Sequence, residues 1–449
     1  MWRIFAKLPV KELVASEFYG YLEMQNCHIC CYQPIRGRSI LVTTVLSLWL
    51  CCSSVALAQR QESSSNTPLN PLEVTTPDPL LPRSNQPLSP QERQSLAAAL
   101  DQLNVQAQAQ LVAGNSVGAF EIWNRELRLR RALGTLAEVQ ALGRVGAIAW
   151  SENETTQVQI ITRRLQAIQQ QIQSQPTTDF TLLRSLGYAY RQVRSPQQAI
   201  EVYNQILAIE RQQQNTVAAE NTLRTIAELH LSWFDYSQAA KSYEELLNIA
   251  TSRGDAFGGS RSRSVSKRSD HRISEVTYLQ QLAYIYDRAR QYQQAVTVKQ
   301  RLADLYLNEA QFTQVPALRL AIASDYQALG QIQQAFENYQ EAYASAWSLQ
   351  QYARAGDALR RLIVLYRSQG QVAEALQTSQ ILLEADNKAA NFYGLMNTYD
   401  QIGQIHLQNG DENAALTAFE QGLAIAQQLQ YQQPYFTQQI QQIQQQLAQ

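Results

Sequence analysis

The sequence predicts an all-α fold built from repeated antiparallel helix pairs. Over most of the 449 residues an alanine recurs at a spacing of mostly forty residues, and apolar positions around it recur at steps of three and four, the spacing of one helix face. With 18 glycines and 13 prolines the chain is neither collagen-like nor wholly disordered. Its net charge of -1 gives it no overall electrostatic attraction to nucleic acid.

Residues 1–58 are predicted to be an amino-terminal extension with an export signal. An apolar run at 40–57 follows a basic flank and ends in small residues, which favours cleavage between Ala58 and Gln59. An uncleaved membrane anchor formed by 40–57 is the alternative, since the run is just long enough to span a bilayer. In both cases the basic flank stays inside, and we expect the rest of the chain in the periplasm or another extracytoplasmic compartment.

The same amino-terminal region holds a second candidate translation start and all the cysteines. Met24 is an internal candidate start alongside Met1. All five cysteines precede the predicted cleavage point: Cys27, Cys30, Cys31, Cys51 and Cys52. A metal knuckle in this region would lack a second pair of ligands, so we expect no metal. The exported part would have neither a disulfide framework nor a thiol nucleophile.

Residues 59–90 are rich in proline, serine and threonine and nearly free of aromatic side chains. Such a segment has too little apolar surface to fold alone. We predict a disordered linker with polyproline character.

Three residue columns define the repeats between 91 and 434. The recurring alanines are Ala119, Ala199, Ala239, Ala295, Ala335, Ala375 and Ala415. Twelve residues earlier stand Ala107, Gly187, Ala227, Ala283, Ala323, Ile363 and Gly403, and three residues after these stand mostly Tyr or His, with Trp150 assigned to the same column in one weak copy. Four residues after the alanine come Trp123, Tyr203, Tyr243, Tyr339 and Phe419, while Lys299 and Ser379 break the column.

This pattern of small residue, aromatic, turn, alanine and aromatic resembles the tetratricopeptide repeat family. The resemblance implies a right-handed superhelical solenoid of about eight helix pairs over 91–434, although the period here is forty rather than thirty-four residues. Glycines at 114, 330, 370 and 410 fall between the two helices, where a left-handed cap is expected. Residues 435–449 are predicted to form a polar-faced capping helix.

The resemblance also implies a binding surface, because the first helix of each pair lines the concave face of such a solenoid. Positions beside the small column carry arginine and tyrosine, which are common binding anchors. The candidate partner-binding residues are Arg184, Tyr188, Arg191, Arg224, Tyr284, Arg288, Arg360 and Arg367. We expect Arg184, Arg191 and Arg224 to form a basic strip that attracts acidic and aromatic side chains of a protein partner.

An insertion at 253–272 lengthens one period. It is rich in glycine, serine and arginine, so we predict a basic, mobile loop. Its Arg261, Arg263, Lys267 and Arg268 are the candidates for binding an anion or an anionic lipid.

No catalytic constellation appears in the sequence. His230 and His406 stand where other repeats have tyrosine, and the simplest interpretation is a packed ring. The function predicted is a non-catalytic protein-binding scaffold in the cell envelope, without cofactor, metal or nucleic acid and with possible membrane association through the amino-terminal apolar segment. Two alternatives stay open: an envelope enzyme with a hydrolytic site on the helical repeats, and an anionic-lipid-binding protein that uses the basic loop.

Overall fold

A computed structural model describes residues 70–81, 87–174, 179–258 and 265–448, although the side chains of 253–272 lie outside the description. Within these ranges the regular structure is helical, without strands, as the sequence predicts. The calls on residues 1–58, including the apolar run 40–57, fall outside the described residues.

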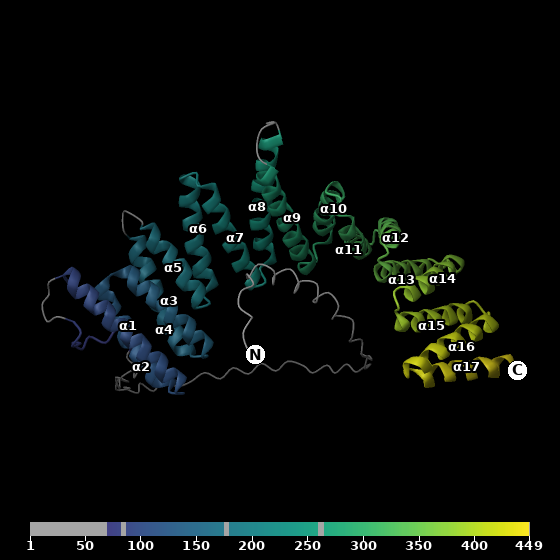
Figure 1. Cartoon of the computed structure of the whole chain (residues 1–449), viewed down its shortest axis with the longest axis horizontal. Coiled ribbons are helices and arrows are strands. Elements are labelled where there is room, and N and C mark those ends of the chain that lie inside the picture. Colours follow the sequence, from purple (N-terminus) through teal and green to yellow (C-terminus); the bar gives the residue numbers. More distant parts are fainter. Residues whose placement is uncertain (1–69, 82–86, 175–178, 259–264, 449) are drawn as a thin grey trace, which may run out of the picture. The chain divides into compact units, whose positions relative to one another are not determined.

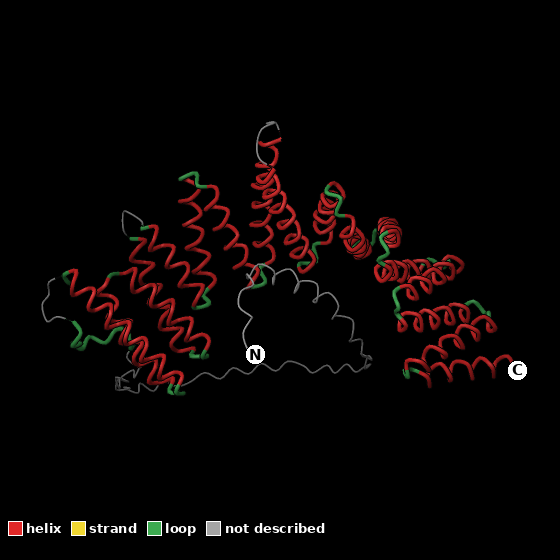
Figure 2. Tube along the Cα trace, viewed as in Figure 1, coloured by secondary structure: helices red, strands yellow, loops and turns green. Residues whose placement is uncertain are grey.

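In the part of the chain that the structure describes, eight helix pairs follow one another, and each helix packs against the next in sequence (Figures 1 and 2). The first helices of the pairs are α1 (Pro90–Val112), α3 (Thr135–Ser151), α5 (Phe180–Gln192), α7 (Thr216–Ser232), α9 (Val265–Arg288), α11 (Val315–Ala328), α13 (Tyr352–Ser368) and α15 (Phe392–Gln408). The second helices are α2 (Ser116–Arg130), α4 (Thr155–Gln173), α6 (Pro196–Gln212), α8 (Tyr236–Gly258), α10 (Tyr292–Asn308), α12 (Ile332–Ser348), α14 (Val372–Lys388) and α16 (Glu412–Leu429). A last helix, α17 (Gln433–Leu447), packs on α16.

The forty-residue period has a simple local basis. In the regular part of the array both helices have 17 residues, as in α13 and α14, and turns of three residues such as 369–371 and 389–391 separate them. The turn needs one residue with positive φ, and the predicted glycines adopt φ of +73° to +80° there. Asn153, Arg194, Phe234 and Arg290 fill the same place in other pairs with φ of 53° to 60°.

The residue columns form the core. Every alanine of the recurring column is fully buried, and so are Trp123, Tyr339 and Phe419. At Gly403 an added Cβ would lie 2.7 to 2.9 Å from three ring carbons of Phe419, so the small column lets an aromatic ring rest directly on the backbone of the facing helix. The columns therefore predict correctly how the two helices of a pair approach each other.

One column assignment is wrong. Trp150 is 51% exposed, and the buried residue of that column is its neighbour Ala149. The small residue of this pair is Gly146, where an added Cβ would lie 2.3 Å from a methyl carbon of Val193. Glycine in this position allows α3 to pack against α5 as well as α4, and the pair is shifted by one residue from the register that Trp150 suggests.

Lys299 breaks the aromatic column and is nevertheless buried. Its Nζ lies 2.6 Å from Oδ1 of Asp287 on α9 and 2.7 Å from Oδ2 of Asp325 on α11. The cation thus joins three successive helices, and two carboxylates compensate its burial. Ser379, the other exception, is buried with its hydroxyl donating to the Ala375 carbonyl.

Two expected irregular segments are more ordered than composition suggests. Composition predicts a loop over 253–272, yet α8 continues to Gly258 and α9 begins at Val265, so helical structure enters this insertion from both sides. In the expected linker 59–90, residues 70–81 make defined turns and Leu72 is only 1% exposed. The contacts that hold this segment join residues some fifty positions apart, which composition does not reveal.

Candidate functional site

The candidate site lies where the first helices α3, α5 and α7 follow one another. Helices α3 and α5 approach closely because Gly143 has no side chain: a Cβ there would lie 3.1 Å from the backbone of Ala189. Ala189 is buried in this contact, and the preceding residue of the helix, Tyr188, points to another side and is 57% exposed.

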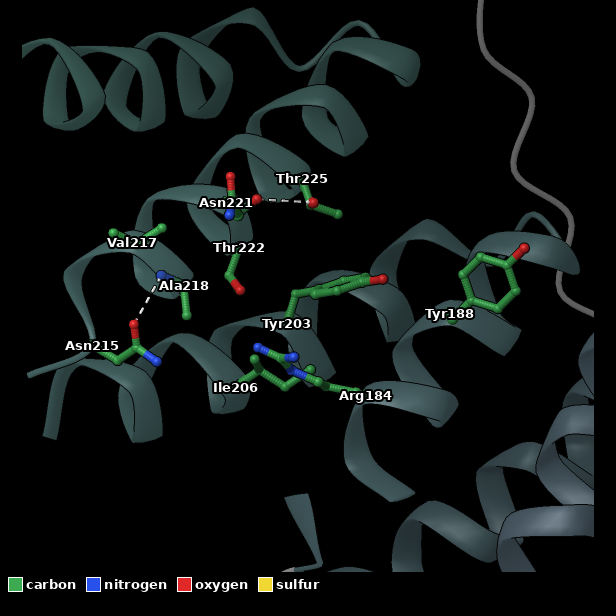
Figure 3. Close-up of a pocket in the computed structure, with 10 residues that line it drawn as sticks. All are labelled: Arg184, Tyr188, Tyr203, Ile206, Asn215, Val217, Ala218, Asn221, Thr222 and Thr225. Carbon is green, nitrogen blue, oxygen red and sulfur yellow. Dashed lines mark hydrogen bonds between the residues drawn. The ribbon is translucent and has the colours of Figure 1, made fainter. Parts of the chain in front are cut away.

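A hollow of about 640 Å³ opens between α5, α6 and α7 (Figure 3). Hydroxyl, amide and apolar side chains share its lining, with one cation. The lining residues are Arg184, Tyr188, Tyr203, Ile206, Asn215, Val217, Ala218, Asn221, Thr222 and Thr225. Figure 3 shows the ring of Tyr203 between Arg184 of α5 and the polar side chains of α7. This hollow therefore offers apolar area together with neutral hydrogen-bonding groups.

A second hollow of about 340 Å³ lies between α3 and α5. It is lined by Val139, Gln140, Gly143, Arg184, Ser185, Tyr188 and Ala189. Arg184 and Tyr188 line both hollows, so these two side chains stand between adjoining depressions. An elongated ligand that crosses α5 would contact them both.

Arg184 is held in place by its own repeat. Its Nη2 donates to Oε1 of the buried Glu210 at 2.6 Å, and its guanidinium lies 4.7 Å from the ring centre of Phe180. The side chain is still 53% exposed. Pairing with Glu210 cancels much of the charge, while the fixed geometry lowers the entropy lost when a ligand binds.

The predicted basic strip does not form as one charged surface. Arg224 of α7 donates to the hydroxyl of Tyr278 at 2.9 Å, so it faces α9 rather than either hollow. Arg191 is exposed on α5 and lines neither hollow. Only Arg184 of the three belongs to the site, and its charge is compensated.

The other candidates of that set lie on more distant repeats. Tyr284 is 40% exposed and Arg288 is exposed, both on α9. Arg360 is bound to the buried Asp386 at 2.8 Å, which gives it a structural contact within its own repeat. Arg367 donates to the Gln408 side chain at 3.2 Å. The structure does not bring these four residues together with Arg184 and Tyr188.

Sequence reasoning missed the contribution of α7 to the site. Val217, Asn221 and Thr225 line the larger hollow, and their spacing of four residues places them on one face of the helix. The sequence shows that spacing, but threonine and asparagine are uncharged and common on exposed helix faces, so the spacing alone does not indicate a binding surface.

The structure does not describe the side chains of the candidate anion-binding residues or the predicted cleavage site. Arg261 and Arg263 fall in 259–264, and the side chains of Lys267 and Arg268 are not described although their backbone belongs to α9. The cleavage pair Ala58 and Gln59 also lies outside the described residues. Among the helices that are described, none is both long and apolar enough to cross a membrane.

The histidines lie in similar surroundings in their two repeats. Nδ1 of His230 is 3.4 Å from Asp235, and Nδ1 of His406 is 3.5 Å from Asp411, in the turn that follows each helix. In the described part of the chain no three His, Cys, Asp or Glu side chains gather in a way that would hold a metal ion. Both histidine side chains are mostly buried, with 16% of His230 and 21% of His406 exposed.

Comparison with known proteins identifies the repeat. Residues 397–429, which span most of α15 and all of α16, match the tetratricopeptide repeat family. No curated protein sequence matches the chain. Among solved structures, BtubC from P. vanneervenii is 19% identical and aligns over 54% of this chain and 91% of its own, with a TM-score of 0.34.

Two further solved structures are similar to a comparable degree. MamA is 16% identical over 46% of this chain and 92% of its own, with a TM-score of 0.32. The apo form of RapI is 10% identical over 74% of this chain and 98% of its own, with a TM-score of 0.34. The family match and the helix pairs agree with the repeat that the residue columns predict.

Proposed function

We propose that this tetratricopeptide-like repeat protein is a non-catalytic scaffold that binds a protein partner across α3, α5 and α7. The observation that carries the proposal is the pair of adjoining hollows with Arg184 and Tyr188 between them. Such helical arrays are typically interaction scaffolds, and arginine and tyrosine are enriched among residues that dominate binding energy.

The lining of the hollows indicates the chemistry of the partner. Threonine, asparagine and tyrosine side chains offer hydrogen bonds to a peptide backbone, while Val217, at 65% exposure, offers apolar contact. Because Glu210 already compensates Arg184, long-range attraction of an acidic partner contributes little here. We therefore expect a partner segment with apolar side chains and a free backbone, bound with weak dependence on salt.

The proposed location is the cell envelope. Its support is the sequence of the first sixty residues, in which a basic flank precedes the apolar run and small residues follow it. A scaffold exported with this signal, or held by it at the membrane, would meet partners outside the cytoplasm.

Affinity capture with matched variants tests the proposal. The full chain and its Arg184→Ala/Tyr188→Ala variant are used to capture proteins from envelope extract, and mass spectrometry compares the amounts of each protein retained. Lys241→Ala, which removes an exposed cation on the second helix α8, is the control. We expect a partner that the parent and the control retain equally and the double variant retains at least tenfold less. Equal retention by all three chains would contradict the proposed surface.

A further inference from the structure

Residues 70–81 lie against the start of the array without being part of a helix. Figure 1 draws this segment in purple beside α1 and α2. Two short turns shape it: the Asn70 side chain accepts from the amide of Leu72, and the Asp78 side chain accepts from the amide of Leu80. The segment has no secondary structure to stabilise it, so its position depends on what it contacts.

Its polar contacts are two arginines of α2. The Arg125 guanidinium donates through Nε and Nη2 to the two carboxylate oxygens of Asp78 at 2.7 and 2.9 Å, a two-pronged pair of hydrogen bonds. Arg128 donates to the Pro71 carbonyl at 2.6 Å. The hydrogen bonds from Arg125 hold the pKa of the Asp78 carboxyl below its usual value of 3.8, so the carboxylate is charged at neutral pH.

Its most buried apolar contact is Leu72, which is 1% exposed and packs within the core that α1 to α6 share, while the partly buried Leu81 packs against a second core of α1 and α2. Leu72 stands six residues before Asp78, so one buried side chain and one paired carboxylate hold the segment at two separate points. An extended peptide bound in a groove is usually held in this way, by pockets for particular side chains and by bonds to its backbone.

The arginines of α2 and of its carboxy-terminal cap, Arg131, divide into two groups. Arg130 and Arg131 pair with carboxylates of the helices themselves, Arg130 with Glu126 and Arg131 with Glu138. Arg125 and Arg128, by contrast, make their hydrogen bonds in the described structure only with the segment. Release of the segment would leave two adjacent cations facing solvent beside an open apolar pocket, which is a site prepared for an acidic, leucine-containing peptide.

We propose that the face of α2 around Arg125 and Arg128 is a peptide-binding site that the chain's own residues 70–81 occupy. Its ligand is an extended peptide with a leucine six residues before a carboxylate. The site is separate from the hollows on α3, α5 and α7, so the experiment that tests it does not depend on whether the proposed function is correct.

Covalent attachment of the segment determines how strongly the site binds a separate peptide. A segment joined to its site by a short connection competes at an effective concentration on the order of millimolar. A separate peptide with the same contacts therefore binds the intact chain poorly and binds well only when the attached segment is weakened.

The test uses a fluorescent peptide with the sequence of residues 70–81 and three forms of the full chain. The first is the parent, the second carries Leu72→Ser and Asp78→Asn to weaken the attached segment, and the third adds Arg125→Ala to those changes. Fluorescence anisotropy measures peptide binding. Limited proteolysis within residues 70–81 reports whether the segment has left, and hydrogen exchange in α5 to α16 reports whether the array is folded.

We expect the peptide to bind the second form at least tenfold more tightly than the parent and at least tenfold more tightly than the third form. A peptide with asparagine in place of its aspartate should lose a similar factor. The proposal is overturned if the second form has released its segment and remains folded yet binds no peptide, or if Arg125→Ala leaves the affinity unchanged. It is equally overturned if the second form retains its segment, because Leu72 and Asp78 would then not be the anchors.

Discussion

The substitution Gly403→Ala tests the close packing that the small column provides. The added Cβ would lie 2.7, 2.8 and 2.9 Å from ring carbons of Phe419, which is fully buried between α15 and α17. Overpacking of this kind costs about 1 to 3 kcal/mol. Alanine gains about 0.8 to 1.0 kcal/mol over glycine inside a helix. The net expectation is a loss of about 1 kcal/mol in the free energy of local unfolding.

Gly187→Ala is the matched control in the same column. Its added Cβ would meet Val202 and Tyr203 at 3.3 to 3.4 Å, so the neighbours need to move only slightly. The gain in helix propensity then outweighs the crowding, and we expect unchanged or slightly increased stability.

Hydrogen exchange is the appropriate assay, because the repeats of such an array need not unfold together. Amides of α15 and α16 in Gly403→Ala should exchange about fivefold faster than in the parent, the factor that about 1 kcal/mol implies. Amides of α5 and α6 in Gly187→Ala should exchange no faster than in the parent. If Gly403→Ala exchanges as slowly as the parent, the small column does not act through close contact and the reasoning fails.

Three further results are expected. Burial raises the pKa of Asp325 from 3.8 to about 6, so the stabilisation from this carboxyl increases as pH falls from about 7 to 4 and is lost as pH rises through 6. Asp325→Asn should remove up to about 3 kcal/mol of this pH dependence of the free energy of unfolding, measured by urea denaturation at pH 4.5 and 7.5. An unchanged pH dependence would contradict the assignment. Ala335→Trp should destabilise the array by about 1 to 3 kcal/mol or more, visible as lost helicity on heating, because the alanine is fully buried, and a silent substitution would mean that the repeat register is wrong. Amino-terminal sequencing of protein from cells should begin at Gln59, whereas recovery of a membrane-integral full-length chain would establish the anchor.

The sequence predicts the pairs and their core because neighbours on the same helix determine those positions. The alanine column and the glycines of the turns needed only spacing and backbone geometry. Trp150 was misplaced because the weak repeat lacks most column residues, and a shift of one residue turns a helix position by about 100°. The burial of Lys299 could not be predicted from its own helix, because it depends on ion pairs with Asp287 and Asp325 from two other helices.

Long-range contacts limited the prediction of the surface. Arg184 looked like a free cation, since its partner Glu210 lies 26 residues away on the second helix. Residues 70–81 looked disordered because the composition of a segment does not show that Arg125 can bind it from 47 residues away. Sequence patterns therefore single out Arg184 and Tyr188 as candidate binding residues, but they do not show the pairing with Glu210 that compensates the charge of Arg184.

Photo-crosslinking from Tyr188 tests the central claim, that a protein partner binds across α3, α5 and α7, most directly. A photoreactive amino acid replaces Tyr188 in one full-length chain and Asn204, an exposed residue of the second helix α6 outside both hollows, in another. Both chains are irradiated in cells, and the crosslinked proteins are identified by mass spectrometry. We predict that a protein partner is captured from position 188 and not from position 204. Capture of the same partner from position 204 alone would contradict the account.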